Sequence, residues 1–204
     1  MDDGSAELIP LHTRNYDVVA FLRDATTLLL RGEVRDTKPP GLYVDDDPDP
    51  LTVHHMVLEL GIRVPDLVIV DAVARMETHP QPACPNVMPR YEQIVGLSIA
   101  RGFNAKVREL FGGPLGCTHT TALLLAMAPV AIQSAWSMNM FKRQDGDGER
   151  RFDAAAREGV IRSSLNTCHI WAEGGEHHIE LRDGGDIPLA LPMRDRLRAL
   201  GREP

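Results

Sequence analysis

The stretch Thr52–Val64, TVHHMVLELGIRV, decides the fold class because its residues alternate. Successive side chains of a β-strand point to opposite faces, so one face of this strand is almost entirely apolar. That face carries Met56, Leu58, Leu60 and Ile62. His54 is the one polar residue on it, and a polar group on the core side needs a partner, either a backbone carbonyl, a metal or a catalytic thiol. His55 points to the opposite face, where we expect solvent.

Three further strands surround this one. Tyr16–Arg23 and Thr27–Asp36 flank a polar corner and predict a hairpin. After a tight turn at Pro65-Asp66, Leu67–Thr78 predicts another strand. One face of that strand is expected to carry Val68, Val70, Ala72, Ala74 and Met76. The first half of the chain therefore predicts an antiparallel meander of about four strands.

The second half has helical spacing. Short helices are predicted at Tyr91–Ala100 and Asn104–Phe111, and a long one at Thr118–Met140 that Pro129 should kink or split. Beyond them, Phe152–Val160 predicts a short helix. Asn166–Asp183 predicts a hairpin that turns at Gly174-Gly175. Strands first and helices second is typical of the α+β class, with helices packed on one face of an antiparallel sheet, here with a C-terminal hairpin added.

The length of 204 residues predicts one main domain. Residues 1–13 are expected to be an acidic leader, and residues 14–204 a single α+β domain. Within it we expect the sheet at 14–78, a helical part at 79–140, a mobile loop at 141–151, and the C-terminal helix and hairpin at 152–185.

Composition narrows the function classes. A net charge of −7 argues against a nucleic-acid partner, because phosphate binding needs a basic face. No apolar run approaches the roughly 20 residues that span a bilayer, and the N-terminus lacks the apolar segment of a signal peptide. We therefore expect a cytoplasmic protein without a membrane partner, whose three cysteines are thiols. No Gly-rich phosphate motif indicates a nucleotide cofactor. The sequence leaves a homo-oligomer open.

Cysteine and histidine residues supply the candidate chemistry. Cys117 and His119 stand where a polar lead-in becomes the long helix, and a helix N-terminus favours a thiolate. Zinc needs three or four ligands, so the pair needs help from Cys84, in a proline-stiffened loop, and from His54. These four residues are the candidate ligands of zinc or iron. Without metal, Cys117, His119 and Cys84 are the candidate catalytic residues. Alternatively, the thiols are simply buried apolar groups.

Other residues carry weaker signals. Arg14 is a candidate to bind a carboxylate or phosphate of a small-molecule substrate. Tyr91 and Trp136 are expected in the core or in the wall of a substrate pocket. Cys168 and His169 are adjacent in a predicted strand, so only one of them can face a given site, and their role stays open.

Several short motifs resemble an uncharacterised bacterial family, the domain of unknown function numbered 2889. The motifs run from about residue 11 to residue 183, and His55 stands where that family has an Asp. They are Leu11-His12-Thr13-Arg14, Asp36-Thr37-Lys38-Pro39, His54-His55-Met56, Cys84-Pro85, Gly116-Cys117-Thr118-His119 and Cys168-His169. The family implies no activity.

A second resemblance, at the level of the fold, is to the iron–sulfur scaffold and sulfur-acceptor proteins of the IscU/NifU and SufE type. Cys84 is similar to the cysteine that follows a strand in that fold, and Cys117 to the cysteine that opens a late helix. The scaffold's first cysteine has no counterpart near Leu51–Val53. The resemblance implies that Cys84 and Cys117 meet at one cluster or zinc ion.

Three classes of function follow from these observations. The first is a small-molecule metabolic enzyme, a metal-dependent or thiol-based lyase or hydrolase, whose Cys/His site lies between the sheet and the helices. The second is a sulfur or iron–sulfur carrier that needs exposed reactive thiols. The third is a non-catalytic binding protein in which the thiols and imidazoles are only packed.

Overall fold

The chain folds into two compact units, Met1–Gly146 and Asp147–Pro204. A computed structural model describes residues 8–99, 102–144, 154–186 and 189–203. It is an α+β structure, as the sequence predicts, with one sheet and its covering helices in the first unit and short helices in the second. Most of the predicted leader and most of the predicted mobile loop at 141–151 lie outside the described residues.

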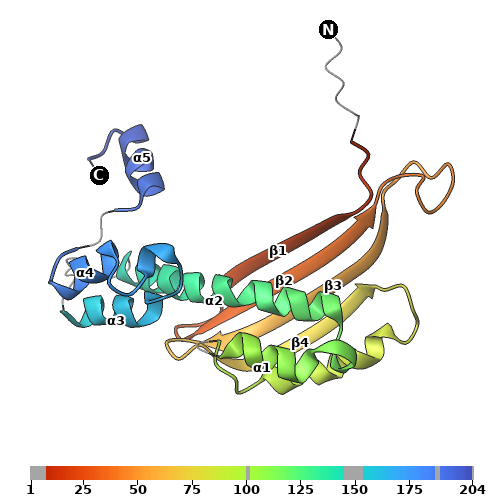
Figure 1. The fold of residues 1–204 in the computed structure, drawn as a ribbon, viewed down its shortest axis with the longest axis horizontal. Helices are drawn as coiled ribbons and strands as arrows, with labels where there is room; N and C mark the ends of the chain where they lie inside the picture. Colours follow the sequence, from red (N-terminus) through yellow and green to blue (C-terminus); the bar gives the residue numbers. More distant parts are fainter. Residues whose placement is uncertain (1–7, 100–101, 145–153, 187–188, 204) are drawn as a thin grey trace, which may run out of the picture. The chain divides into compact units, whose positions relative to one another are not determined.

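The sheet is a four-stranded antiparallel meander, which confirms the prediction (Figure 1). Its order is β1-β2-β3-β4, so each strand pairs with the next one along the chain. The strands are β1 (Thr13–Leu22), β2 (Thr27–Lys38), β3 (Leu51–Arg63) and β4 (Val68–Thr78). This order needs no crossover, and the pairing places Arg14 of β1, Asp36 of β2 and His54 of β3 at the same end of the sheet.

One face of the sheet forms the core, and the other mixes charged residues with exposed apolar ones such as Val19, Phe21 and Val73. The apolar face predicted for β3 is buried: Met56, Leu58, Leu60 and Ile62 are each at most 1% exposed. On the opposite face, Glu59 lies between Arg31 and Arg75, 2.8 Å and 3.3 Å away. Cross-strand charges of this kind keep the face hydrated and contribute little stability each.

The predicted inward face of β4 is wrong at its first residues. Ile62 pairs with Ile69 while Gly61 pairs with Asp71, so Val70 is an extra residue in a bulge. A bulge shifts the alternation by one position. Ile69 is consequently fully buried, whereas Val70 is exposed.

A 3₁₀-helical segment, η1 (Cys84–Ile94), follows β4 in place of the helix predicted at Tyr91–Ala100. Pro85 stands in the first turn, where a helix needs no N–H donor, which favours a start here, and Pro89 lacks the N–H that an α-helix would use at its position. Residues 95–99 then run along the edge of β4. The N–H of Ile69 donates to Leu97 O at 2.9 Å, and the N–H of Ile99 donates to Leu67 O at 2.9 Å. This pairing covers the edge of the sheet at the start of β4.

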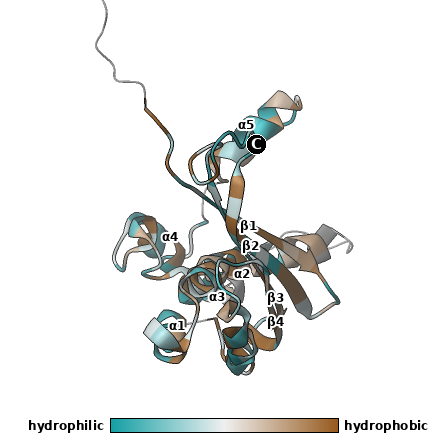
Figure 2. Ribbon diagram, turned by 90° about the vertical axis from the view of Figure 1, so that its right-hand side faces the viewer, coloured by the Kyte–Doolittle hydropathy of each residue, from teal (hydrophilic) through white to brown (hydrophobic). Residues whose placement is uncertain are grey.

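Helices α1 (Phe103–Phe111) and α2 (Thr118–Gln144), joined through η2 (Gly113–Leu115), lie on the same side of the sheet (Figure 2). The predicted helix at Asn104–Phe111 and the long helix are both confirmed, and α2 continues through Pro129 without splitting. Gly32 of β2 lets α2 approach closely, since a Cβ there would lie 2.6 Å from Met127 Sδ. α2 is therefore packed directly on the centre of the sheet.

The same helix corrects one expectation from the sequence. Thr118–Phe141 is long and apolar enough to cross a membrane by length and composition. Part of its apolar surface contributes to the core of the first unit, where Leu123, Leu124 and Met127 are fully buried. A core helix of this kind meets the same criterion, so the observation is weak evidence for a membrane span.

The second unit contains short helices. They are α3 (Ala154–Ser164), η3 (His169–Trp171), α4 (Glu176–Arg182) and α5 (Leu191–Ala199). The predicted hairpin at Asn166–Asp183 is wrong: Gly175 is the N-cap of α4, and Glu176 and Arg182 lie at its two ends with the charges that the helix dipole favours. The helix predicted at Phe152–Val160 corresponds to α3. The prediction of one domain over residues 14–204 stays a prediction.

Candidate active site

The site begins with the last row of side chains on the core face of the sheet. Arg14 of β1 pairs with Asp36 of β2, and Asp36 pairs with His54 of β3. Directly opposed residues point to the same face, so these three side chains continue the face that buries Val34 and Met56. Beyond this row the ladder is interrupted, because the next pairing skips a residue of β3. The last row of side chains on this face is therefore polar, whereas the rest of the face is apolar.

The first turn of α2 brings two more residues to this row. The carbonyl of Cys117 accepts the first helical hydrogen bond, from the N–H of Thr121 at 2.9 Å, so Cys117 is the N-cap residue. Tyr91 fixes its backbone: the N–H of Cys117 donates to the Tyr91 hydroxyl at 2.8 Å, and that hydroxyl lies 3.0 Å from the Cys117 carbonyl. Arg90 donates to the carbonyl of Leu115 at 2.9 Å. The loop before α2 is therefore anchored to η1.

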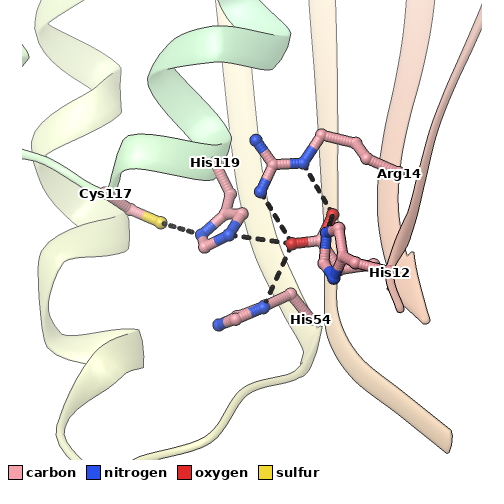
Figure 3. A network of polar contacts seen from close by, with 6 residues as sticks. His12, Arg14, His54, Cys117 and His119 are labelled. Carbon is pink, nitrogen blue, oxygen red and sulfur yellow. Dashed lines mark hydrogen bonds and ion pairs between the residues drawn. The ribbon is translucent and has the colours of Figure 1, made fainter. Parts of the chain in front are cut away.

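Asp36 is the central group, and it is only 1% exposed. Arg14 binds it with two parallel hydrogen bonds, Nε to Oδ1 at 2.6 Å and Nη2 to Oδ2 at 2.7 Å. His12 Nε2 lies 3.6 Å from Oδ1 (Figure 3). The hydrogen bonds from Arg14 lower the pKa of Asp36 to about 2, against the opposing effect of burial. Asp36 is therefore a buried, permanently charged carboxylate at ordinary pH.

His119 connects this carboxylate to the thiol of Cys117 (Figure 3). Its Nε2 lies 3.0 Å from Asp36 Oδ2, and its Nδ1 lies 3.8 Å from Cys117 Sγ. A neutral imidazole whose Nε2–H donates to the carboxylate presents the lone pair of Nδ1 to the thiol. Burial, helped by the neighbouring His54, lowers the pKa of His119 and favours this neutral form. The order thiol, imidazole, carboxylate is the arrangement of an activated nucleophile.

His54 lies against His119 without a hydrogen bond of its own at Nδ1. The two rings stack with centroids 3.9 Å apart and an angle of 26°. His54 Nδ1 is 3.3 Å from Asp36 Oδ2, but it is buried and has no hydrogen-bond partner among the described residues. Oδ2 already accepts from Arg14 and from His119, which uses both of its lone pairs. A buried polar atom left without a partner needs an explanation.

The structure brings part of the predicted metal set together. Donor atoms of Asp36, His54 and His119 all lie within 4.8 Å of one another, and among the described residues this is the one group of three such side chains. Cys84 and Cys117 are not members of that group. Cys84 is half-buried at the start of η1, and Cys117 contacts His119 instead.

Asp36 is the site residue that the sequence analysis missed. The alternation that singles out His54 on β3 also places Asp36 on the core face of β2, after Leu28, Leu30 and Val34. Applying the same test to both strands finds it. His55, by contrast, faces away as predicted, with its Nε2 3.0 Å from Glu33 Oε2.

The three predicted substrate-binding residues have different surroundings. The guanidinium of Arg14 is bound to Asp36, so its charge is already balanced. Tyr91 is fully buried and stacks on Phe111, which makes it a positioning residue for Cys117. Trp136 is 38% exposed and lies about 25 Å along α2 from His119, at about 1.5 Å per residue.

Cys168 and His169 lie in the second unit and not in a strand. Cys168 is exposed, and His169 begins the short helix η3. The prediction that they share a strand is therefore wrong.

Comparison with known proteins defines the family. No curated protein and no solved structure matches the chain, so the resemblance to iron–sulfur scaffolds stays a prediction. A family model described as a protein of unknown function, DUF2889, matches residues 12–133, more than half of the chain. The matched range holds every residue of the site above and ends before Cys168-His169. The chain therefore belongs to the DUF2889 family, as its motifs predict.

Proposed function

We propose that the chain is a thiol-dependent enzyme that acts on a small molecule, with Cys117 as nucleophile, His119 as general base and Asp36 as the group that orients His119. The observation that carries the proposal is the continuous line of contacts from Cys117 Sγ to His119 Nδ1 at 3.8 Å and from His119 Nε2 to Asp36 Oδ2 at 3.0 Å. A nucleophile, a base and a third group that orients the base are the parts that covalent catalysis requires.

Hydrolysis of an activated acyl group is the reaction that these parts support best. Sγ of Cys117 attacks the carbonyl carbon while the thiol proton moves to Nδ1 of His119, and that proton is then given to the leaving group. Water hydrolyses the thioester with His119 again acting as base. The N–H groups at the start of α2 have no intrahelical acceptor and lie beside the nucleophile, where they can stabilise an oxyanion.

The ion pair between Arg14 and the buried Asp36 supports the roles given to His119. Because Arg14 holds both oxygens of Asp36, the carboxylate keeps one orientation and one charge. The hydrogen bond from Nε2 then fixes the tautomer of His119, as the carboxylate does in known catalytic triads. Tyr91 and Arg90 hold the loop that carries Cys117, so the thiol and the imidazole are both presented by restrained backbone.

Alkylation of the three cysteines with iodoacetamide, followed residue by residue by mass spectrometry, tests the proposal. Cys168 is the exposed cysteine, while Cys84 and Cys117 are half-buried. Simple accessibility therefore predicts that Cys168 reacts first, as in a non-catalytic binding protein. An activated Cys117 reacts first instead, and His119→Ala slows Cys117 alone, by about tenfold.

A second measurement tests covalent catalysis itself. With p-nitrophenyl acetate as an activated ester, we expect a burst of nitrophenol and an acetyl group on Cys117. Cys117→Ala should abolish both signals, and Cys168→Ala is the matched control that keeps them. Alkylation in the order of exposure, together with no acetylation of Cys117, would overturn the proposal. Persulfide uptake at Cys117 without acyl chemistry would instead favour the sulfur-carrier alternative.

A further inference from the structure

We infer that Asp36, His54 and His119 form a binding site for one divalent transition-metal ion such as zinc, and that the bound ion inhibits the thiol chemistry because His119 then no longer serves as the base for Cys117. The inference rests on the proposed function for its second half only. The binding site stands on the geometry of the three side chains, whose donor atoms lie within 4.8 Å of one another.

The donors and their spacing suit such an ion. Two imidazoles and one carboxylate are a ligand set that zinc accepts with a fourth position left open. Zinc–ligand distances of about 2.0–2.2 Å in a tetrahedral site separate ligand atoms by about 3.3 Å. Asp36 Oδ2 lies 3.0 Å from His119 Nε2 and 3.3 Å from His54 Nδ1, so its two separations already match.

The unpartnered nitrogen of His54 is the independent observation. His54 Nδ1 is buried beside an ionised carboxylate and has no hydrogen-bond partner among the described residues. A metal ion between these atoms gives that nitrogen a ligand bond and uses the negative charge of Asp36. Arg14 is hydrogen-bonded to the same carboxylate and then holds the orientation of this ligand, as groups that hydrogen-bond to metal ligands commonly do.

Binding requires one ring to turn. The lone pair of an imidazole nitrogen lies in the ring plane, and two rings stacked at 3.9 Å with an angle of 26° cannot both aim at one ion. Both nitrogens of His119 have contacts, to Asp36 and to Cys117, whereas Nδ1 of His54 has no hydrogen bond. His54 is therefore the ring expected to turn.

The proton on His119 explains the inhibition. Without metal, the contact with Asp36 favours the proton on Nε2, and the lone pair of Nδ1 then faces Cys117 Sγ. When Nε2 binds the ion, the same proton moves to Nδ1, so no proton is gained or lost. Nδ1 then cannot accept the thiol proton, and Cys117 loses its base. Metal binding and thiol activation are thus alternative states of the same imidazole.

Zinc titration of the metal-free full chain by calorimetry tests the site. We expect one zinc per chain, and His54→Ala should weaken binding by at least about tenfold. His55→Ala is the matched control, because His55 is the adjacent residue of the same type and contacts Glu33 on the other face of the sheet. Equal affinities of the two variants, or no zinc binding by the unmodified protein, would overturn the inference.

Two further measurements separate this inference from the proposed function. Cys117→Ala should keep its zinc affinity, and a loss there would overturn the three-residue site by making Cys117 a ligand. Zinc should slow alkylation of Cys117 in the unmodified protein but not in His54→Ala, and equal slowing in both would overturn the switch. If Cys117 is unreactive yet zinc binds through His54, the proposed function fails while the metal site stands.

Discussion

Replacing Asp36 by Asn tests the central electrostatic argument, because it keeps the shape of the side chain and removes its charge. The pKa of Asp36 is about 2 in the folded protein, against 3.8 for an ordinary Asp. That difference is worth about 2 kcal/mol of folding free energy at neutral pH. Because the pKa is lowered by folding, this stability is fully present above pH 3.8 and is lost as the pH falls towards 2.

The expected result is therefore a difference that depends on pH. In metal-free protein at about pH 7, Asp36→Asn should be less stable than the unmodified protein by about 2 kcal/mol, and at about pH 3 by about half of that. Urea unfolding followed by tryptophan fluorescence measures it. Trp136 lies in the first unit and Trp171 in the second, so a Trp171→Phe background makes the fluorescence report the unit that holds Asp36.

A surface aspartate supplies the control. Asp66 forms an ion pair with Arg63, but both side chains are about half exposed, so Asp66→Asn should change the urea midpoint far less. Equal stability of Asp36→Asn and the unmodified protein at neutral pH would refute the reasoning. So would a difference that stays constant down to acidic pH, since it would then come from packing and not from charge.

Three other substitutions have defined outcomes. Tyr91→Phe leaves the N–H of Cys117 without its acceptor and should cost about 1–3 kcal/mol in urea unfolding; an unchanged midpoint would show that water replaces the hydroxyl. Gly32→Ala places a methyl group against a core methionine of α2 and should cost about 1–3 kcal/mol, measured as a lower Tm; an unchanged Tm would mean that α2 moves away freely. Ile69→Asp should unfold the sheet, whereas Val70→Asp should stay within about 0.5 kcal/mol, and the reverse order in circular dichroism melting would contradict the bulge.

The sheet and the long helix could be predicted from the sequence because alternation and helical spacing are local signals. Met56, Leu58, Leu60 and Ile62 follow strict alternation, and the structure buries all four. The inward face of β4 could not be predicted in full, because a bulge at Val70 adds one residue and nothing local marks it. The prediction of a C-terminal hairpin was wrong for a related reason. Gly174-Gly175 is typical of a turn, but here it precedes the start of a helix.

The candidate site was predicted in part. Cys117 and His119 stand out because both lie at the start of one helix, and His54 because it interrupts an apolar face. Alternation on β2 also places Asp36 on the core face, but that Asp36 is their common partner depends on the register of β2 with β3, which sequence alone does not give. Cys84 was grouped with them because cysteine is a good metal ligand. The residue type does not say where a side chain lies in the fold, and Cys84 is not in the group of donor atoms that the structure brings together.

The interruption of the β2–β3 ladder beside His54 has a consequence for how the chain tolerates change in length. Asp36 is paired with His54, but the next contact joins Thr37 to Thr52, so Val53 is an extra residue. Residues gained or lost in the segment 39–50 can be absorbed at this irregular junction. A change in the length of that loop is therefore expected to leave the Asp36–His54 pair, and the alignment of Arg14 with it, intact.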